Sequence, residues 1–95
     1  MDSVLNLLGL AYAARKTVLG EEVYNRIKNV KIIFIASDIS EKSKERIDKK
    51  CFYYHIDSIN CYSAEELSNA VGRNNVKLIG ITDKGFSQSI KEKLK

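Results

Sequence analysis

The sequence predicts an α/β fold, a three-layer α/β/α sandwich with about four strands and with helices on both faces of the sheet. Short apolar runs that are typical of buried strands alternate along the chain with segments whose apolar residues recur at helical spacing. The length of 95 residues, with 44% hydrophobic residues and no proline, fits one compact domain over residues 1–95. No repeat or low-complexity stretch divides the chain.

The first helix is expected from about Ser3 to Ala14, with Asp2 or Ser3 as its cap. Its apolar face is widened by Leu10, so most of its circumference should be buried. The run Val4–Leu10 superficially resembles the apolar core of a signal peptide, but an acidic residue precedes it and it is far shorter than the ~20 residues of a membrane-spanning helix. We therefore expect a core helix, a cytoplasmic protein and no membrane partner.

A short strand is expected over Lys16–Leu19, because its centre is β-branched. Gly20 then precedes Glu21 and Glu22, which are well placed in the first turn of a second helix. The inner face of that helix is expected to hold Val23, Ile27 and Val30.

The continuous apolar run Ile32–Ala36 suits a strand that is covered on both faces. A third helix is expected over about Glu41–Tyr54, capped by Ser40. The next strand, around Asp57–Tyr62, alternates apolar and polar residues, which is typical of a position near the edge of a sheet. The inward residues of this half are expected to be Ile47, Cys51, Tyr54, Ile59 and Cys61.

A capping box of Ser63 and Glu66 opens a fourth helix, and Gly72 is a natural left-handed C-cap. The last strand is expected over Lys77–Thr82, and Asp83 caps a last helix with Phe86, Ile90 and Leu94 inside. Because helices alternate with strands, we expect a largely parallel sheet with right-handed crossovers.

Residues that could support catalysis or bind a metal are few. His55 is the only histidine, and Cys51 and Cys61 have the spacing of neither a zinc framework nor a redox pair, so we expect two reduced, buried thiols. Asp38 and Asp83 follow strands, where a parallel sheet would place an active site, but both also suit turn or N-cap positions. We expect no enzyme, no catalytic residue, no metal and no cofactor.

The positive charge is unevenly distributed. The formal net charge is +4 and the isoelectric point is near 9.1. Residues 42–50 carry five basic and two acidic side chains, and residues 73–95 carry six basic and two acidic side chains. In contrast, residues 51–72 carry three acidic side chains and no lysine or arginine. This asymmetry favours an anionic partner such as nucleic acid, although a lysine-rich helix is often only a solvated face.

One local arrangement is more specific. Lys16 lies shortly before Gly20, and Gly20 opens a helix that also carries Arg26. Amides at a helix start attract phosphates, and a glycine there allows another backbone to come close. The same residues also fit an ordinary helix start, so the pattern alone does not choose between the two interpretations.

Short motifs spread over nearly the whole chain resemble a known family. They are Leu8-Gly9-Leu10-Ala11, Arg15-Lys16, Gly20-Glu21-Glu22, Ile35-Ala36-Ser37-Asp38, Cys51 with Tyr53-Tyr54, Glu66-Leu67, Gly72, and Ile81-Thr82-Asp83-Lys84-Gly85-Phe86. In this order they resemble the bacterial YlxQ-type branch of the ribosomal protein L7Ae superfamily. The resemblance implies an α/β/α sandwich and an RNA-binding protein. Many members of that superfamily recognise the kink-turn, a sharply bent internal loop with tandem sheared G·A pairs.

The resemblance implies that RNA contacts the segment that opens the second helix, typically Gly-x-Asn-Glu with a basic residue three positions on. Gly20 and Arg26 match the glycine and the basic residue, whereas Glu22 and Val23 replace the asparagine and the glutamate. Gly20 would allow close approach of the RNA, Arg26 would contact a phosphate or a guanine, and Glu22 would accept hydrogen bonds from a guanine edge.

The second contact region implied by the resemblance is the loop before the last strand. The family pattern Leu-Gly-x-Ala-x-Gly stands here at residues 67–72, with Ser68 in place of the first glycine. The loop from Arg73 to Val76 would close over the bent RNA, and Arg73 would stack on an extruded base. Three tyrosines are expected to pack in the core or near the surface rather than to bind bases: Tyr12, Tyr53 and Tyr54.

The sequence therefore predicts a non-catalytic, monomeric, cytoplasmic protein that binds structured, kink-turn-like RNA, either ribosomal RNA or a ribosome-associated RNA. The predicted RNA-binding residues are Lys16, Gly20, Glu21, Glu22, Arg26, Arg73, Asn74 and Asn75. Two alternatives remain open. One is a protein-interaction module for ribosomal or transcription proteins with vestigial RNA binding, and the other is a small-molecule enzyme that uses Asp38 and Asp83.

Overall fold

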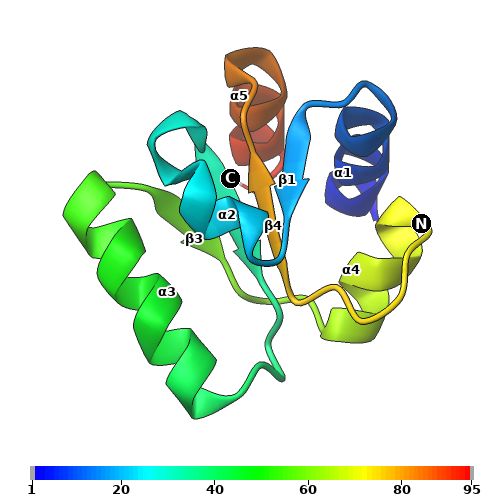
Figure 1. Cartoon of the computed structure of the whole chain (residues 1–95). Helices are drawn as coiled ribbons and strands as arrows, with labels where there is room; N and C mark the ends of the chain where they lie inside the picture. The colour runs from blue at the N-terminus through cyan, green and yellow to red at the C-terminus, as the bar shows by residue number, and fades with distance from the viewer. Residues whose placement is uncertain (1, 95) are drawn as a thin grey trace.

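The computed structural model describes residues 2–94 and places a four-stranded sheet between two layers of helices (Figure 1). The strands are β1 (Thr17–Leu19), β2 (Ile32–Ile35), β3 (Asp57–Ile59) and β4 (Leu78–Ile81). The helices are α1 (Ser3–Ala13), α2 (Glu22–Asn25), α3 (Glu41–Tyr54), α4 (Ala64–Val71) and α5 (Lys84–Lys93), with a 3-10 turn, η1, at Ile27–Asn29.

Each face of the sheet packs against its own group of helices. Successive side chains of a strand point to opposite faces, so Ile32 and Phe34 of β2 lie on one face and Ile33 and Ile35 on the other. The first pair packs with the buried residues of α1, α4 and α5. The second pair packs with those of α2, η1 and α3. The predicted three-layer sandwich is confirmed.

The prediction of a largely parallel sheet was wrong. The strand order is β1-β4-β2-β3, and only β2 and β3 are parallel, whereas β4 runs antiparallel to both β1 and β2. A strand that is covered on both faces shows the same apolar run whatever the direction of its neighbours. The direction of β4 follows from α4 and residues 72–77, which return the chain to the edge where β3 ended instead of crossing the sheet.

This topology gathers several connections at one edge of the sheet. β1, β2 and β3 end there and β4 begins there, so four segments meet, namely residues 20–21, 36–40, 60–63 and 72–77. Main-chain hydrogen bonds join them: Gly20 N–H to the Leu78 carbonyl at 3.0 Å, Ala36 N–H to the Lys77 carbonyl at 2.9 Å, and Ser37 N–H to the Tyr62 carbonyl at 2.8 Å. We call these four segments the loop edge; it is the lower edge of the sheet in Figure 1.

The helix caps predicted from the sequence are present. Asp2 accepts from Val4 N–H, Ser40 from Ser43 N–H, and Asp83 from Phe86 N–H. Ser63 and Glu66 form the reciprocal capping box of α4, and Gly72 ends that helix with φ of 67°. Such caps satisfy amides and carbonyls that a helix end leaves unpaired, and they depend only on neighbours in sequence.

The second helix is shorter than predicted. The expectation of one helix that carries Val23, Ile27 and Val30 is wrong, because α2 ends at Asn25, with Arg26 as its C-cap, and the chain continues as η1. Residues 22–31 must carry the chain from the loop edge back to the opposite edge, where β2 begins. A 3-10 turn covers more of this distance per residue, because it rises about 2.0 Å per residue against about 1.5 Å in an α-helix. The predicted inner stripe is nevertheless buried: Val23, Ile27 and Val30.

Three side chains expected inside are exposed, namely Leu10, Cys61 and Leu94, and so is Tyr53, which was expected in the core or near the surface. β3 ends at Ile59, so its alternation does not extend to Cys61. Leu94 follows the last residue of α5. Leu10 and Tyr53 lie on outward faces of their helices. Among residues 2–94, no helix has the length and apolar character needed to cross a membrane.

Candidate nucleic-acid interface

Gly20 has the backbone conformation and the open surroundings of a contact point. Its φ is 57°, a left-handed conformation that favours glycine, and a β-carbon built on it would meet nothing within 4 Å. Its own N–H donates to Leu78 on β4, which holds it at the end of β1. Within the described chain, the next two amides, of Glu21 and Glu22, have no acceptor, and no side chain caps α2. Two donors therefore lie beside an unobstructed α-carbon.

A hollow in the loop edge brings together three predicted residues from two segments that are distant in sequence. Gly20 and Glu21 line it from the end of β1, and Asn75 lines it from the loop before β4. We call it the loop-edge hollow; its remaining lining residues are Tyr24, Ile39, Ser43, Arg46, Lys77 and Leu78.

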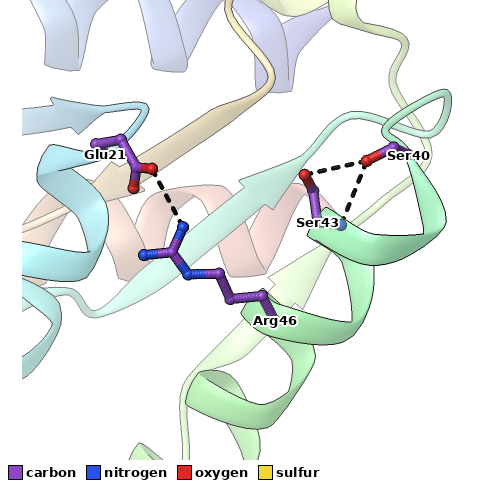
Figure 2. A network of polar contacts seen from close by, with 4 residues as sticks. All are labelled: Glu21, Ser40, Ser43 and Arg46. Carbon is purple, nitrogen blue, oxygen red and sulfur yellow. Dashed lines mark hydrogen bonds and ion pairs between the residues drawn. The ribbon is translucent and has the colours of Figure 1, made fainter.

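Arg46 reaches this hollow from α3. Its Nη1 donates to Glu21 Oε1 at 3.1 Å, as Figure 2 shows, and its guanidinium lies 3.7 Å from the centroid of the Tyr24 ring. Burial raises the pKa of Tyr24, and the positive charge of Arg46 opposes that rise. Figure 2 also shows the α3 cap, in which Ser40 Oγ accepts from Ser43 N–H. In the sequence Arg46 is only one residue of a basic segment, because no local pattern signals a contact between residues 25 positions apart.

The loop of Arg73, Asn74 and Asn75 lines a second hollow, together with the outer side of α4. Asn75 belongs to both hollows and has a φ of 56°, which asparagine tolerates better than most residues. The buried Ser68 fixes this loop, since its Oγ accepts from Val76 N–H at 2.9 Å and donates to the Val76 carbonyl at 3.4 Å. The serine in place of the family glycine is thus an anchor for the loop.

The side chain of Arg73 is held against the first helix. Its Nη1 donates to the hydroxyl of Tyr12 at 3.0 Å, so the exposed guanidinium lies at the end of α1. Tyr12 is half-buried, as expected for a packing residue, and it positions Arg73.

The structure separates the roles of the α2 residues. Val23 is completely buried, so the position that matches the family glutamate is in the core and faces no ligand. Glu22 is exposed and accepts a hydrogen bond from Asn25 Nδ2 at 3.1 Å. Arg26 is exposed at the end of α2. The carboxylate available on this segment is therefore that of Glu22.

Lys16 is not brought to the other predicted residues. Lys16 precedes β1, whereas Gly20 follows β1. The carbonyl of Lys16 accepts from Thr82 N–H at 2.9 Å, at the edge of the sheet opposite the loop edge. Four residues of extended chain separate the two positions by about 13 Å.

The two aspartates considered for an enzyme lie at opposite edges. Asp38 follows β2 and accepts from Ala64 N–H at 2.8 Å, which ties the loop edge to α4. Asp83 follows the antiparallel β4 and caps α5. They share no site. Between residues 2 and 94, no group of three histidine, cysteine or acidic side chains is arranged to hold a metal ion.

Known proteins resemble this chain over nearly its whole length. The model of the ribosomal protein L7Ae/L30e/S12e/Gadd45 family matches residues 2–91. The chain is 35% identical over 94 residues to RNA-binding protein YlxQ of Enterococcus faecium, covering 96% of this chain and 90% of that protein. It is 32% identical over 87 residues to RNA-binding protein YlxQ of Bacillus subtilis (strain 168), covering 88% of this chain and 87% of that protein.

Solved structures agree with this relationship. A protein of unknown function from Bacillus halodurans C superposes with a TM-score of 0.92 at 31% identity, covering 99% of this chain and 98% of that one. The 15.5kD RNA-binding protein of Giardia lamblia superposes with a TM-score of 0.74 at 17% identity, covering 96% of this chain and 81% of that one. The two proteins therefore share the fold. The motif resemblance is confirmed, and the chain belongs to the ribosomal protein L7Ae/L30e/S12e/Gadd45 family.

Proposed function

We propose that this chain is a non-catalytic RNA-binding protein that docks a structured, kink-turn-like RNA of the ribosome, or of a ribosome-associated particle, on its loop edge. The observation that carries the proposal is the left-handed Gly20, open above its α-carbon and beside two unpaired amides, in one hollow with Asn75. The relatives that match most of the chain are named RNA-binding proteins, which supports the same conclusion.

The chemistry of the loop edge suits a phosphate backbone. The amides of Glu21 and Glu22 donate to phosphate oxygens, and the missing side chain at Gly20 lets the sugar-phosphate chain approach. Arg46 and Lys77 line the same hollow and supply cations beside these donors, and Arg26 adds an exposed cation at the C-cap of α2. The Glu22 carboxylate accepts from the edge of a guanine.

The two hollows that share Asn75 suit a bent rather than a straight RNA. One arm of the RNA docks in the loop-edge hollow and the other contacts the Arg73–Asn75 loop. Ser68 holds that loop in place before the RNA arrives, so less conformational entropy is lost on binding.

Fluorescence anisotropy with a labelled kink-turn RNA, and with a straight duplex of the same length, tests the proposal. Gly20→Asn keeps a residue that tolerates the left-handed conformation but fills the open space, and Arg26→Glu reverses an exposed charge. We expect each to weaken kink-turn binding by about tenfold or more with little change in folding. Lys28→Glu, an exposed reversal on the neighbouring turn, is the matched control. Affinity should also fall as salt rises. Unchanged affinity in both test variants would remove the loop edge from the proposal.

A second candidate is favoured by one observation. Glu22 and the buried Val23 stand where the family pattern has asparagine and glutamate, which weakens the case for kink-turn specificity. The alternative is a protein-interaction module in the ribosome or the transcription machinery. A protein pull-down that survives nuclease treatment would favour it. Purifying the chain without nuclease and sequencing the nucleic acid that accompanies it would identify the RNA.

A further inference from the structure

The exposed surface of α3 is divided into flanks of opposite charge. Five residues spaced i, i+4, i+7, i+8 and i+11 cover about 100° of the helix on the side toward α2. We call them the α3 cationic flank: Lys42, Arg46, Lys49, Lys50 and Tyr53. The acidic residues of the helix, Glu41, Glu45 and Asp48, lie at the other side of its exposed surface. The cationic flank lines the groove along α3, with Glu45 and Tyr54 at its borders.

Within the described chain, Arg46 is the one cation of this flank that has an acidic partner, and its three lysines have none. Among residues 2–94, the ion pairs are Lys44–Asp48, Arg46–Glu21 and Lys91–Asp57, so Lys42, Lys49 and Lys50 have no acidic partner. Like charges one helical turn apart, as in Lys42/Arg46 and Arg46/Lys50, repel and destabilise a helix. An anionic ligand on this flank would relieve that repulsion.

An aromatic ring is exposed at the end of the same flank. The side chain of Tyr53 is 73% exposed. Its ring meets that of Tyr54 edge to face, with centroids 4.8 Å apart, so it is held in position although most of it contacts solvent. An exposed ring beside cations is what an unpaired base uses for stacking. The structure excludes the core position that the sequence allowed for Tyr53 and places its ring near the surface, against Tyr54.

The groove lies next to the loop-edge hollow, because Arg46 lines both. We propose that the α3 cationic flank binds a single-stranded RNA segment that continues from the structured RNA on the loop edge, with phosphates on Lys42, Lys49 and Lys50 and a base on Tyr53. The distance from Lys42 to Tyr53 along the helix is about 16 Å, enough for several nucleotides. This inference rests on the proposed function. An acidic protein would satisfy the lysines but would not need Tyr53.

The test compares two RNAs. One is a kink-turn RNA with flush ends, and the other carries a single-stranded tail of about eight nucleotides, added to either end in turn. We expect a tail at one end to tighten binding to the wild type by about tenfold. Lys49→Gln/Lys50→Gln and Tyr53→Ala should lose this gain, whereas Tyr53→Phe, which can still stack, should keep it. All variants should bind the flush RNA as the wild type does.

A matched control and a salt titration separate contact from general attraction. Lys28→Gln/Lys31→Gln removes two exposed charges that lie outside α3, and it should keep the gain from the tail. Lys49→Gln/Lys50→Gln should lower the salt slope for the tailed RNA by about 1.4, because each single-strand phosphate contact contributes about 0.7. Thermal unfolding of every variant confirms that it is folded.

Different failures have different meanings. If the wild type binds the flush RNA but no tail adds affinity, the α3 proposal is overturned and the proposed function stands. Equal losses for flush and tailed RNA in Lys49→Gln/Lys50→Gln also overturn it. If the wild type binds neither RNA, the proposed function fails and this inference with it. A nuclease-resistant protein partner that Lys49→Gln/Lys50→Gln releases, with no effect of the tail, would assign the groove to protein instead.

Discussion

The guanidinium of Arg46 donates a hydrogen bond to the Glu21 carboxylate across 3.1 Å and so connects the middle of α3 to the start of α2 at the loop edge. The two side chains are 55% and 74% exposed. An ion pair so accessible to water contributes less than about 1 kcal/mol to stability. Its consequence is positional, because it orients an arginine that lines both the groove along α3 and the loop-edge hollow.

Replacing Arg46 separates its contribution to binding from its contribution to folding. Arg46→Ala should weaken RNA binding by about tenfold, the loss of one charge-assisted hydrogen bond to a phosphate. The free energy of unfolding should change by less than about 1 kcal/mol, by urea titration. Arg46→Lys keeps the charge without the planar fork of the guanidinium, so its RNA affinity should lie between those of the wild type and Arg46→Ala. An affinity of Arg46→Ala equal to that of the wild type would exclude this arginine from the interface.

Ser68→Ala should destabilise the protein by about 1–3 kcal/mol, because it leaves the buried N–H of Val76 without an acceptor. A change of 1 kcal/mol shifts the unfolding temperature of a domain this size by about 4–8 °C, which calorimetry resolves. Asn69→Ala, at the exposed neighbouring position of α4, is the control and should have little effect. A Ser68→Ala variant as stable as the control would show that the loop does not depend on this hydroxyl.

Gly9→Ala should also destabilise, by about 1–3 kcal/mol, because a methyl group at Gly9 would lie 2.8 Å from the carbonyl oxygen of Ala70 and push α1 away from α4. The sign is diagnostic. In a helix without such a neighbour, replacing glycine by alanine stabilises by about 0.5–1 kcal/mol. A higher unfolding temperature for Gly9→Ala would therefore contradict the close packing of the two helices.

The two thiols should differ in reactivity. Cys61 is exposed and Cys51 is buried, and burial raises the pKa of Cys51 to about 11, so little of it is thiolate near neutral pH. Ellman's reagent at pH 8 should modify one thiol rapidly in the native protein and both in urea. Cys61→Ser should abolish the rapid reaction. Rapid modification of both thiols in the folded wild type would contradict the burial of Cys51.

Stability should depend on pH through the hydrogen bond that Tyr62 donates to Asp2 at 2.9 Å. This bond lowers the pKa of Asp2, so its contribution is present above the ordinary aspartate pKa and is lost as the pH falls through the lowered value. Burial, together with the same bond, raises the pKa of Tyr62, so its neutral form stabilises the fold below about pH 10 and this contribution is lost as the pH rises further.

Unfolding temperatures of the wild type and Tyr62→Phe between pH 2 and pH 11 would test this. The phenylalanine keeps the ring but donates no hydrogen bond, so the difference between the two proteins should be largest between about pH 5 and pH 9 and should narrow below about pH 4 and above about pH 10. A constant difference across the whole range would mean that the hydroxyl acts through packing alone.

The elements that could be predicted from the sequence are those whose signals are local. The bounds of α3 match the prediction, because Ser40 caps the helix and the inward residues recur at helical spacing. The buried runs of β2 and β4 are strands, since four consecutive apolar residues fit a strand covered on both faces. The left-handed end of α4 at Gly72 follows from the absence of a side chain.

The candidate site was predictable only in part. Gly20 and the Arg73–Asn75 loop were identified from motifs, and the fold places both at the loop edge. Lys16 was grouped with Gly20 because they are close in sequence, yet a strand carries the chain across the sheet between them. Arg46 was not recognised, because its partner Glu21 lies in a different helix.

The sequence by itself determined which segments are helices and strands, where most of them end and which sides of them are buried, because caps, alternation and helical spacing act between neighbours in the chain. Only the tertiary structure decided the direction of β4, the meeting of four connections at one edge, and the position of Arg46 in both the groove along α3 and the loop-edge hollow. Those features depend on the route by which helices return the chain to the sheet, and the apolar pattern of a buried strand is the same for either direction.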